Sequence, residues 1–231
     1  MGHFVLPGNP PVELTLRRSA RARRISLRVS GVDGRITLTM PSGLPEKTAL
    51  EFADSKAEWL RTQIKKQPEL KRVAPGLELP VEGVLRRISS TKGKRISMQG
   101  TEIFIPGRIE TLPKRLEAWL KARARNQLAL MSDHYASEIG QNYRLLTLRD
   151  TRSRWGSCSH EKRLMFSWRL ILAPPEVLNY VAAHEVAHLA EMNHSKLFWA
   201  KVKSLYPGYE QPRQWLRKNG ASLHRYRFDT E

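Results

Sequence analysis

The chain has 231 residues, of which 40% are hydrophobic and 27% charged, a balance typical of globular proteins and not of disordered ones. Lysine and arginine number 40 against 22 aspartate and glutamate residues, so the formal net charge is +18. The single cysteine, Cys158, excludes an intrachain disulfide and a cysteine-based structural zinc site.

The chain carries no sign of export or membrane insertion. No apolar run approaches the roughly 18 residues that a membrane span needs. Residues 1–11 lack the basic region and the apolar region of a secretion signal. We therefore expect a soluble, cytoplasmic protein that does not associate with a membrane.

The N-terminal part predicts an antiparallel β unit. Alternating apolar and polar residues predict three strands, at 12–16, 25–29 and 36–40. Asp33 and Gly34 separate the last two and are a strong hairpin signal. The arginine-rich segment 17–24 leads into the second strand, and we expect it to form a strand edge or an arm that faces the substrate.

The next segments predict one helix and then more strands. Apolar residues at helical spacing predict a helix over 45–67, which Pro68 ends. Residues 75–106 are punctuated by proline and glycine and predict several short strands, including 95–98 and 102–105.

The C-terminal half predicts a mixture of helices and strands. A long amphipathic helix covers 113–139, followed by Gly140. The other predicted elements are strands at 145–148 and 164–172 around the loop 152–160, a helix from 174 to about 192, and helices at 195–205 and 212–219. The clearest boundary falls near 107–112. We therefore expect a β-rich N-terminal module with one helix over 1–110 and an α+β catalytic domain over 111–231.

The motif that carries chemistry is His184-Glu185-Val-Ala-His188 on a predicted helix. Residues four apart lie on one helix face, so His184 and His188 can reach a single ion. Glu185 points aside, where it can take a proton from a water molecule without being a metal ligand. This spacing is typical of zinc hydrolases of the H-E-x-x-H type.

A catalytic zinc needs a third protein ligand, and two residues are candidates. His194 lies six residues after His188, so the helix has to break before it; Asn193 tolerates left-handed geometry and can end the helix there. Ser195 can then cap the next helix. Glu191 is the rival ligand, because it lies three residues after His188 near the same face. We favour His194.

The sequence resembles a known family, the YgjP-like metallopeptidases, which are more distantly related to the SprT-like and WLM zinc proteases. The resemblance rests on Arg-Ser-Arg-Trp-Gly-Ser-Cys-Ser at 152–159, Phe-Ser-Trp-Arg-Leu at 166–170 and the segment 184–199, within a block that matches over 148–226. The resemblance implies a zincin-like catalytic domain, with the metal-binding helix packed on a small sheet. It also implies one zinc ion on His184, His188 and His194, with Glu185 catalytic.

Two arginines are candidates for substrate binding. Arg152 and Arg154 lie two apart in a loop, so an extended segment projects both to one side. They can hold a substrate carboxylate or phosphate by paired hydrogen bonds, or they can pair with acidic residues near the metal helix. Together with Tyr226 they are also candidate oxyanion donors.

Other reactive residue types favour structural roles. Three tryptophans, Trp155, Trp168 and Trp199, are expected in the core. Cys158 is read as a small buried side chain, with a redox-sensitive thiol as the alternative. His224 is interpreted as structural because no neighbouring motif connects it to the metal helix.

The predicted function is a zinc-dependent hydrolase, most simply a metallopeptidase acting on polypeptides. One alternative is hydrolysis of a nucleotide phosphoanhydride, and another is a protease associated with nucleic acid. The net charge of +18 motivates both alternatives, because it favours weak association with nucleotides or nucleic acids. Against the nucleotide alternative, the chain has no glycine-rich phosphate loop.

Overall fold

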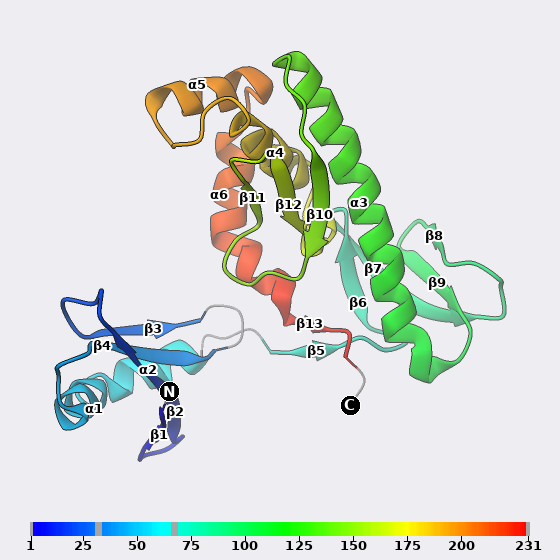
Figure 1. Cartoon of the computed structure of the whole chain (residues 1–231). Coiled ribbons are helices and arrows are strands. Elements are labelled where there is room, and N and C mark those ends of the chain that lie inside the picture. The colour runs from blue at the N-terminus through cyan, green and yellow to red at the C-terminus, as the bar shows by residue number, and fades with distance from the viewer. Residues whose placement is uncertain (1, 31–33, 66–68, 230–231) are drawn as a thin grey trace. The chain divides into compact units, whose positions relative to one another are not determined.

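The computed structural model describes residues 2–30, 34–65 and 69–229. The chain divides into two compact units, Met1–Glu69 and Leu70–Glu231 (Figure 1). The boundary expected near 107–112 differs from this division. Residues 71–106 belong to the second unit because their apolar side chains join its core: Val73, Leu79, Val81, Ile88, Ile103 and Ile105.

The first unit is a four-stranded sheet with two helices. Its strands are β1 (Gly2–Leu6), β2 (Val12–Ser19), β3 (Ser26–Val29) and β4 (Ile36–Pro41), in the order β1-β2-β4-β3. The three predicted strands are confirmed, and β1 is an additional strand. β3 and β4 pair antiparallel, as the hairpin signal predicts, although Asp33 lies outside the described residues. The sheet is mixed and not wholly antiparallel, because β2 pairs with β4 in parallel.

The helix predicted over 45–67 is two helices, α1 (Glu46–Asp54) and α2 (Ala57–Lys65). The helix is interrupted at Ser55, whose hydroxyl donates a hydrogen bond to the carbonyl of Phe52 (2.7 Å). A serine that bonds to its own helix backbone competes with the helix pattern. Pro68 lies outside the described residues.

The second unit begins with a small sheet. The strands β6 (Glu78–Val81), β7 (Val84–Thr91), β8 (Ser97–Gln99) and β9 (Glu102–Pro106) have the order β6-β7-β9-β8. β5 (Lys71–Arg72) pairs in parallel with β13 (Tyr226–Arg227), which joins the two ends of this unit. After the short turn η1 (Ile109–Thr111), the long helix α3 spans Leu112–Glu138, close to its predicted bounds. Gly140 follows it with a φ of +60°, the left-handed geometry of a helix end.

The remaining elements build the α+β layer that carries the site. β10 (Leu145–Arg149), β11 (Gly156–Cys158) and β12 (Arg163–Ser167) form a sheet in the order β10-β12-β11. The helices are α4 (Pro175–Ala187), α5 (Lys196–Leu205) and α6 (Glu210–Asn219), followed by η3 (Gly220–Arg225). α4 packs against α3, β11, α5 and α6. The predicted α+β class is confirmed, and α4, the helix that carries His184, packs on this small sheet.

One predicted strand in this layer is too long. The strand predicted over 164–172 ends at Ser167, and residues Trp168–Leu172 form the 3-10 helix η2. All five η2 residues are buried. Because every side of this segment is covered, its sequence shows no alternation that would distinguish a strand from a buried helical turn.

A buried arginine ties η2 to the end of the chain. Arg169 is 7% exposed and donates hydrogen bonds to both carboxylate oxygens of Asp150 (2.7 and 3.0 Å). It also donates to the carbonyls of Leu223 (3.2 Å) and Tyr226 (3.0 Å). Burial raises the pKa of Asp150, but the hydrogen bonds and charge of Arg169 outweigh it, so that the net pKa lies below its ordinary value.

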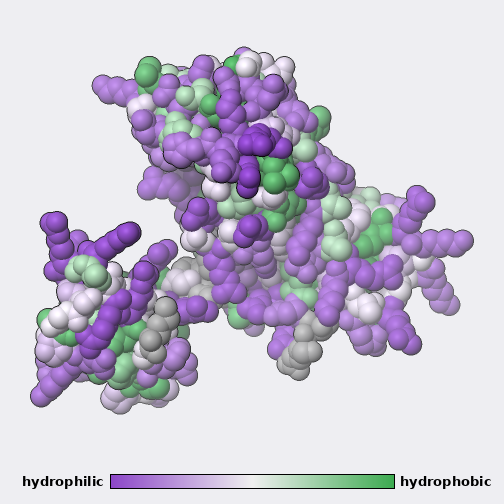
Figure 2. Space-filling view, in the orientation of Figure 1, coloured by the Kyte–Doolittle hydropathy of each residue, from purple (hydrophilic) through white to green (hydrophobic). Residues whose placement is uncertain are grey.

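The surface matches the high charge of the sequence. The face drawn in Figure 2 is mostly hydrophilic, with small, separate hydrophobic areas. Among the residues that the structure describes, no helix combines the length and the apolar character needed to cross a bilayer.

Candidate metal centre

Three histidines from consecutive parts of the chain meet at one point. His184 lies on the last turn of α4, His188 caps that helix, and His194 precedes α5. Their ligand nitrogens all lie within 4.8 Å of one another. The Nε2 atoms of His184 and His194 are 3.1 Å apart.

This spacing fits a tetrahedral zinc ion. A zinc–nitrogen distance of about 2.0–2.1 Å at tetrahedral angles puts two ligand nitrogens about 3.3 Å apart. The 3.1 Å between His184 and His194 is close to that value. Three imidazoles also leave a fourth position for water, as catalytic zinc sites do. The side chain of His194 is exposed, so the group can be reached from solvent.

The chain turns earlier than the sequence suggests. α4 was expected to run to about Met192, but it ends at Ala187, whose carbonyl accepts hydrogen bonds from the N–H groups of Ala190 (3.1 Å) and Glu191 (3.0 Å). The expectation of a left-handed Asn193 is wrong, because the only non-glycine residues with positive φ in the described chain are Glu82 and Lys162. The break is a tight turn directly after His188, which brings the chain back to the end of α4.

The segment before α5 is held by its own polar side chains. The side-chain oxygen of Asn193 accepts a hydrogen bond from the N–H of Ser195 (3.1 Å). Ser195 in turn caps α5, as predicted, by accepting from the N–H of Phe198 (3.3 Å). These bonds hold His194 at the point where it faces His184.

Glu191 contributes its backbone and not its carboxylate. The ring nitrogen Nδ1 of His188 lies 2.9 Å from the Glu191 carbonyl oxygen. A carbonyl can only accept, so Nδ1 carries the proton and donates it. Nε2 of His188 is then the free acceptor, available to a cation. The group that the geometry assembles contains His194 and leaves out the Glu191 side chain.

Burial favours the neutral form of two of the imidazoles, His184 and His188. Burial, with smaller effects from the charges of His188, His194 and Arg213, lowers the pKa of His184 to about 3. Burial also lowers the pKa of His188, against the hydrogen bond to Glu191. Neutral imidazole is the form that binds a metal ion.

Glu185 is buried beside this group. It is 5% exposed and lies on the face of α4 that packs against β11. A Cβ atom added to Gly156 would lie 2.5 Å from its Oε1, so the glycine makes room for the carboxylate. Burial raises the pKa of Glu185 to about 8, and the charge of Arg154 opposes this rise. A buried carboxyl group with a raised pKa, beside side chains that could hold a metal ion, is a candidate general base.

Aromatic rings enclose the histidines. Phe198 is fully buried and packs on all three rings, at centroid distances of 4.9 Å to His184, 4.4 Å to His188 and 4.7 Å to His194. Trp199 contacts His184 (5.7 Å) and His194 (5.9 Å). These aromatic side chains hold the histidine rings in place, while the exposed His194 leaves the group open to solvent.

Some residues of this wall were not predicted from the sequence. Tyr180 lies 5.8 Å from the ring of His184 and stacks on Tyr209 at 6.3 Å. Its position one helical turn before His184 could have identified Tyr180 from the sequence, because residues four apart share a helix face. Trp199 was expected in the core, but it is only partly buried and forms part of the site. No sequence signal connects Tyr209 to the motif.

The two loop arginines, Arg152 and Arg154, lie on the surface. Arg154 is exposed, and its charge acts on Glu185. Arg152 is also exposed.

Burial and the charge of Glu185 raise the pKa of Cys158 to about 11, which agrees with an unreactive, protonated thiol.

Two other candidate residues lie away from the histidine group. His224 is buried and packs on Trp155 (5.1 Å), which agrees with a structural role. Tyr226 is 3% exposed, pairs with β5 and accepts a hydrogen bond from Arg225 (3.1 Å).

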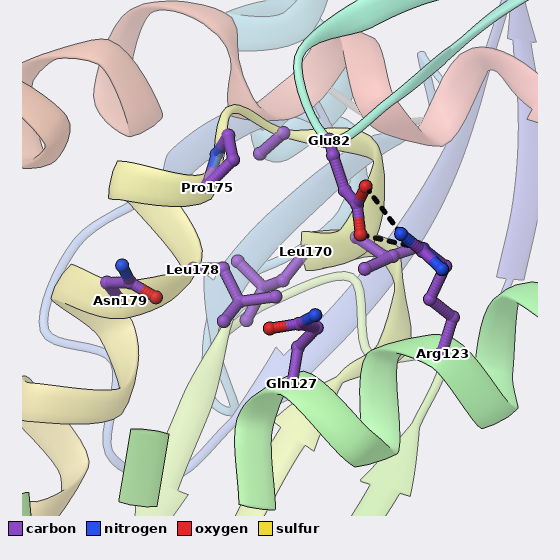
Figure 3. A pocket seen from close by; sticks show the side chains of 9 residues that line it. Glu82, Arg123, Gln127, Leu170, Pro175, Leu178 and Asn179 are labelled. Carbon is purple, nitrogen blue, oxygen red and sulfur yellow. Dashed lines mark hydrogen bonds and ion pairs between the residues drawn. The ribbon is translucent and has the colours of Figure 1, made fainter. Parts of the chain in front are cut away.

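A separate hollow lies at the start of α4 (Figure 3). Glu82 and Arg123 form a two-pronged ion pair across it (2.7 and 2.9 Å), and the N–H of Glu82 donates to the carbonyl of Ile171 (2.7 Å). An added Cβ on Gly83 would meet Pro174 at 3.0 Å. The turn between β6 and β7 thus packs directly on the entrance of α4 and positions the helix that carries His184.

The family model described as "YgjP-like, metallopeptidase domain" matches residues 23–219. No curated protein matches the chain by sequence. Among solved structures, the metallopeptidase zymogen of Pyrococcus abyssi abylysin aligns with 20% identity and a TM-score of 0.37, covering 43% of this chain and 97% of that one.

Proposed function

The chain belongs to the YgjP-like family of metallopeptidase domains, and from this premise we propose that it is a zinc-dependent peptidase. Zinc is held by His184, His188 and His194, with Glu185 as the general base. The observation that carries the proposal is the convergence of three imidazoles within 4.8 Å beside a buried carboxylate.

Zinc is the metal that the donor set favours. Three neutral imidazoles with no carboxylate ligand suit zinc far better than magnesium or calcium, which take oxygen ligands. Zinc, when bound, supplies Lewis-acid polarisation of a carbonyl group and of a water molecule.

The protein supplies the proton transfers. Glu185 takes a proton from the attacking water and later delivers it to the leaving amine. Burial raises the pKa of Glu185 and the charge of Arg154 opposes the rise, which supports a proton-transfer role for this carboxyl group. Arg154, whose charge reaches Glu185, is placed to stabilise negative charge on the substrate, and Arg152 in the same loop is the second candidate.

A second candidate function is hydrolysis of a nucleotide phosphoanhydride. The exposed Arg154 beside Glu185 favours it, because phosphate oxygens attract arginine. Such chemistry has to neutralise several oxygens at once, usually with magnesium or a nest of backbone amides. Amide hydrolysis needs only one polarised carbonyl and one water, and is therefore preferred.

The test supplies zinc-loaded protein with unfolded polypeptides and, separately, with nucleoside triphosphates. Glu185→Gln serves as the control for contaminating activities. Peptide cleavage that depends on Glu185 supports the proposal. Phosphate or pyrophosphate release that depends on Glu185, without peptide cleavage, overturns the peptidase in favour of the second candidate.

A further inference from the structure

An arginine of α6 lies on the aromatic wall of the metal centre. The guanidinium carbon of Arg213 is 4.2 Å from the centroid of the Trp199 ring, well inside the range of a cation–π contact. Trp199 is the residue whose ring contacts His184 and His194. Arg213 is thus one side chain removed from two of the three histidines.

The stack holds Arg213 in a fixed position. Tyr209 stacks on Trp199 at 5.5 Å with an interplanar angle of 21°, and Tyr180 stacks on Tyr209. Tyr180 comes from α4 and Trp199 from α5, so three helices contribute to one layer. A guanidinium held over a ring by a cation–π contact is partly ordered in advance, so it loses less entropy when its N–H groups bind a ligand.

Arg213 has no acidic partner. No carboxylate lies within ion-pair distance of it among residues 2–30, 34–65 and 69–229. The guanidinium lies over the Trp199 ring, and its charge also acts on His184. Arg213 is partly buried, whereas the buried Arg169 uses its hydrogen bonds on Asp150 and two carbonyls. Five N–H donors of Arg213 therefore remain available to a ligand.

The surface beside Arg213 is cationic. Arg213 lines a shallow hollow on α6 together with Glu210, Gln214, Arg217 and Lys218. Arg217 and Lys218 are exposed, so three cations face a single carboxylate there. A hollow of this sign attracts an anionic group, and Arg213 connects it to Trp199, which contacts two of the histidines.

We infer that Arg213 is a specificity residue that binds a carboxylate of the polypeptide substrate, so that the enzyme prefers an acidic group near the bond it cleaves. The guanidinium offers the paired donors that a carboxylate accepts in two parallel hydrogen bonds. The carboxylate can be that of an aspartate or glutamate side chain or the free C-terminus of a peptide. This inference rests on the proposed peptidase function.

The experiment measures binding, so that it does not depend on turnover. Zinc-loaded Glu185→Gln protein is titrated calorimetrically with a short neutral peptide through which one glutamate is moved position by position. Each glutamate peptide has a glutamine counterpart, and each is made with an amidated and with a free C-terminus. The same titrations are repeated with Glu185→Gln proteins that carry a second substitution: Arg213→Gln, Arg213→Lys or Arg108→Gln.

Arg108→Gln is the matched control. It removes the same charge from an exposed arginine that precedes η1 and belongs neither to the histidine group nor to the hollow on α6. Thermal melts of all variants check that the fold is kept.

The expected result is one position at which glutamate binds at least about tenfold more tightly than glutamine, as a charge-assisted hydrogen bond provides. This preference disappears in Arg213→Gln, survives in part in Arg213→Lys and is unchanged in Arg108→Gln. If only the free C-terminus produces it, the ligand is the terminal carboxylate.

Three results overturn the inference: no peptide shows a preference, the preference survives Arg213→Gln, or Arg213→Gln weakens glutamate and glutamine peptides equally. The last would mean that Arg213 only supports Trp199. Separately, wild-type protein that binds the acidic peptide through Arg213 but never cleaves it would end the peptidase proposal and leave the binding role of Arg213 intact.

Discussion

The carboxylate of Glu185 lies directly against Gly156, so closely that a Cβ atom at position 156 would be 2.5 Å from Oε1 and 2.6 Å from Cγ. Gly156 has no positive φ, so the glycine is needed here for space and not for backbone geometry. The edge strand β11 therefore sets the position of the proposed base.

Gly156→Ala should displace Glu185 without removing the metal. We expect kcat to fall by about a hundredfold, as a misplacement of about 1 Å can cause, while zinc content stays at the wild-type level. Steady-state kinetics and metal analysis measure both quantities. Gly208→Ala is the control, because an added Cβ there meets nothing within 4 Å. Wild-type kcat in Gly156→Ala would show that the contact does not position the base.

Glu185→Gln should keep fold and zinc and lose turnover. The amide is nearly isosteric but cannot accept a proton, and loss of a general base costs about 10²–10⁴-fold in rate. The measurement is hydrolysis of a validated peptide substrate beside a thermal melt. Wild-type turnover in this variant would rule out Glu185 as the base.

His194→Ala and Glu191→Ala should differ strongly in zinc affinity. His194 provides a ligand nitrogen, so we expect its loss to weaken binding by orders of magnitude. Glu191 acts on His188 through its backbone carbonyl, which alanine retains, so Glu191→Ala should change the affinity far less than the 10–100-fold typical of lost supporting hydrogen bonds. Competition with a zinc chelator measures both. The opposite ranking would identify the Glu191 carboxylate as the third ligand.

Arg169→Met should destabilise the second unit. The change removes hydrogen bonds to Asp150 and leaves the carbonyls of Leu223 and Tyr226 without this donor, which should cost at least about 2 kcal/mol of unfolding free energy. The control is Arg163→Met, whose partner Glu161 is exposed. Equal denaturation midpoints for the two variants would contradict the structural role of Arg169.

The same ion pair has a pH dependence of known sign. The pKa of Asp150 is lowered in the folded state despite burial, because Arg169 stabilises the carboxylate. The contribution of the Asp150–Arg169 ion pair to the free energy of unfolding is therefore complete above the unfolded pKa of Asp150, about 3.9. It is lost as the pH falls through the lower pKa of the folded state. The stability difference between wild type and Arg169→Met should shrink in that acidic range.

The sequence was most informative where one local pattern decides the structure. Periodicity predicts the strands at 12–16 and 36–40 and the bounds of α3. The spacing of four residues predicts that His184 and His188 share one face of a helix. The parallel pairing of β2 with β4 depends on contacts between distant segments, which no local period encodes. The sequence did not predict the end of α4 at Ala187, because the residues after it have a composition typical of a helix. The turn is stabilised by tertiary contacts of His188 and His194.

The site was predicted in the same uneven way. His194 could be proposed from its spacing, but its approach to His184 depends on the turn after His188 and on the bonds of Asn193 and Ser195. Trp199 and Arg213 come from two other helices, and only the packed structure brings them to the metal centre.

The most direct test is a crystal structure of the zinc-loaded protein with anomalous diffraction recorded at the zinc absorption edge. We expect one anomalous peak in the second unit, about 2.0–2.1 Å from a ring nitrogen of each of His184, His188 and His194, with the Glu185 carboxylate beside the open position. No peak at these three rings, or a peak bound by the Glu191 carboxylate in place of His194, would contradict the proposed metal centre.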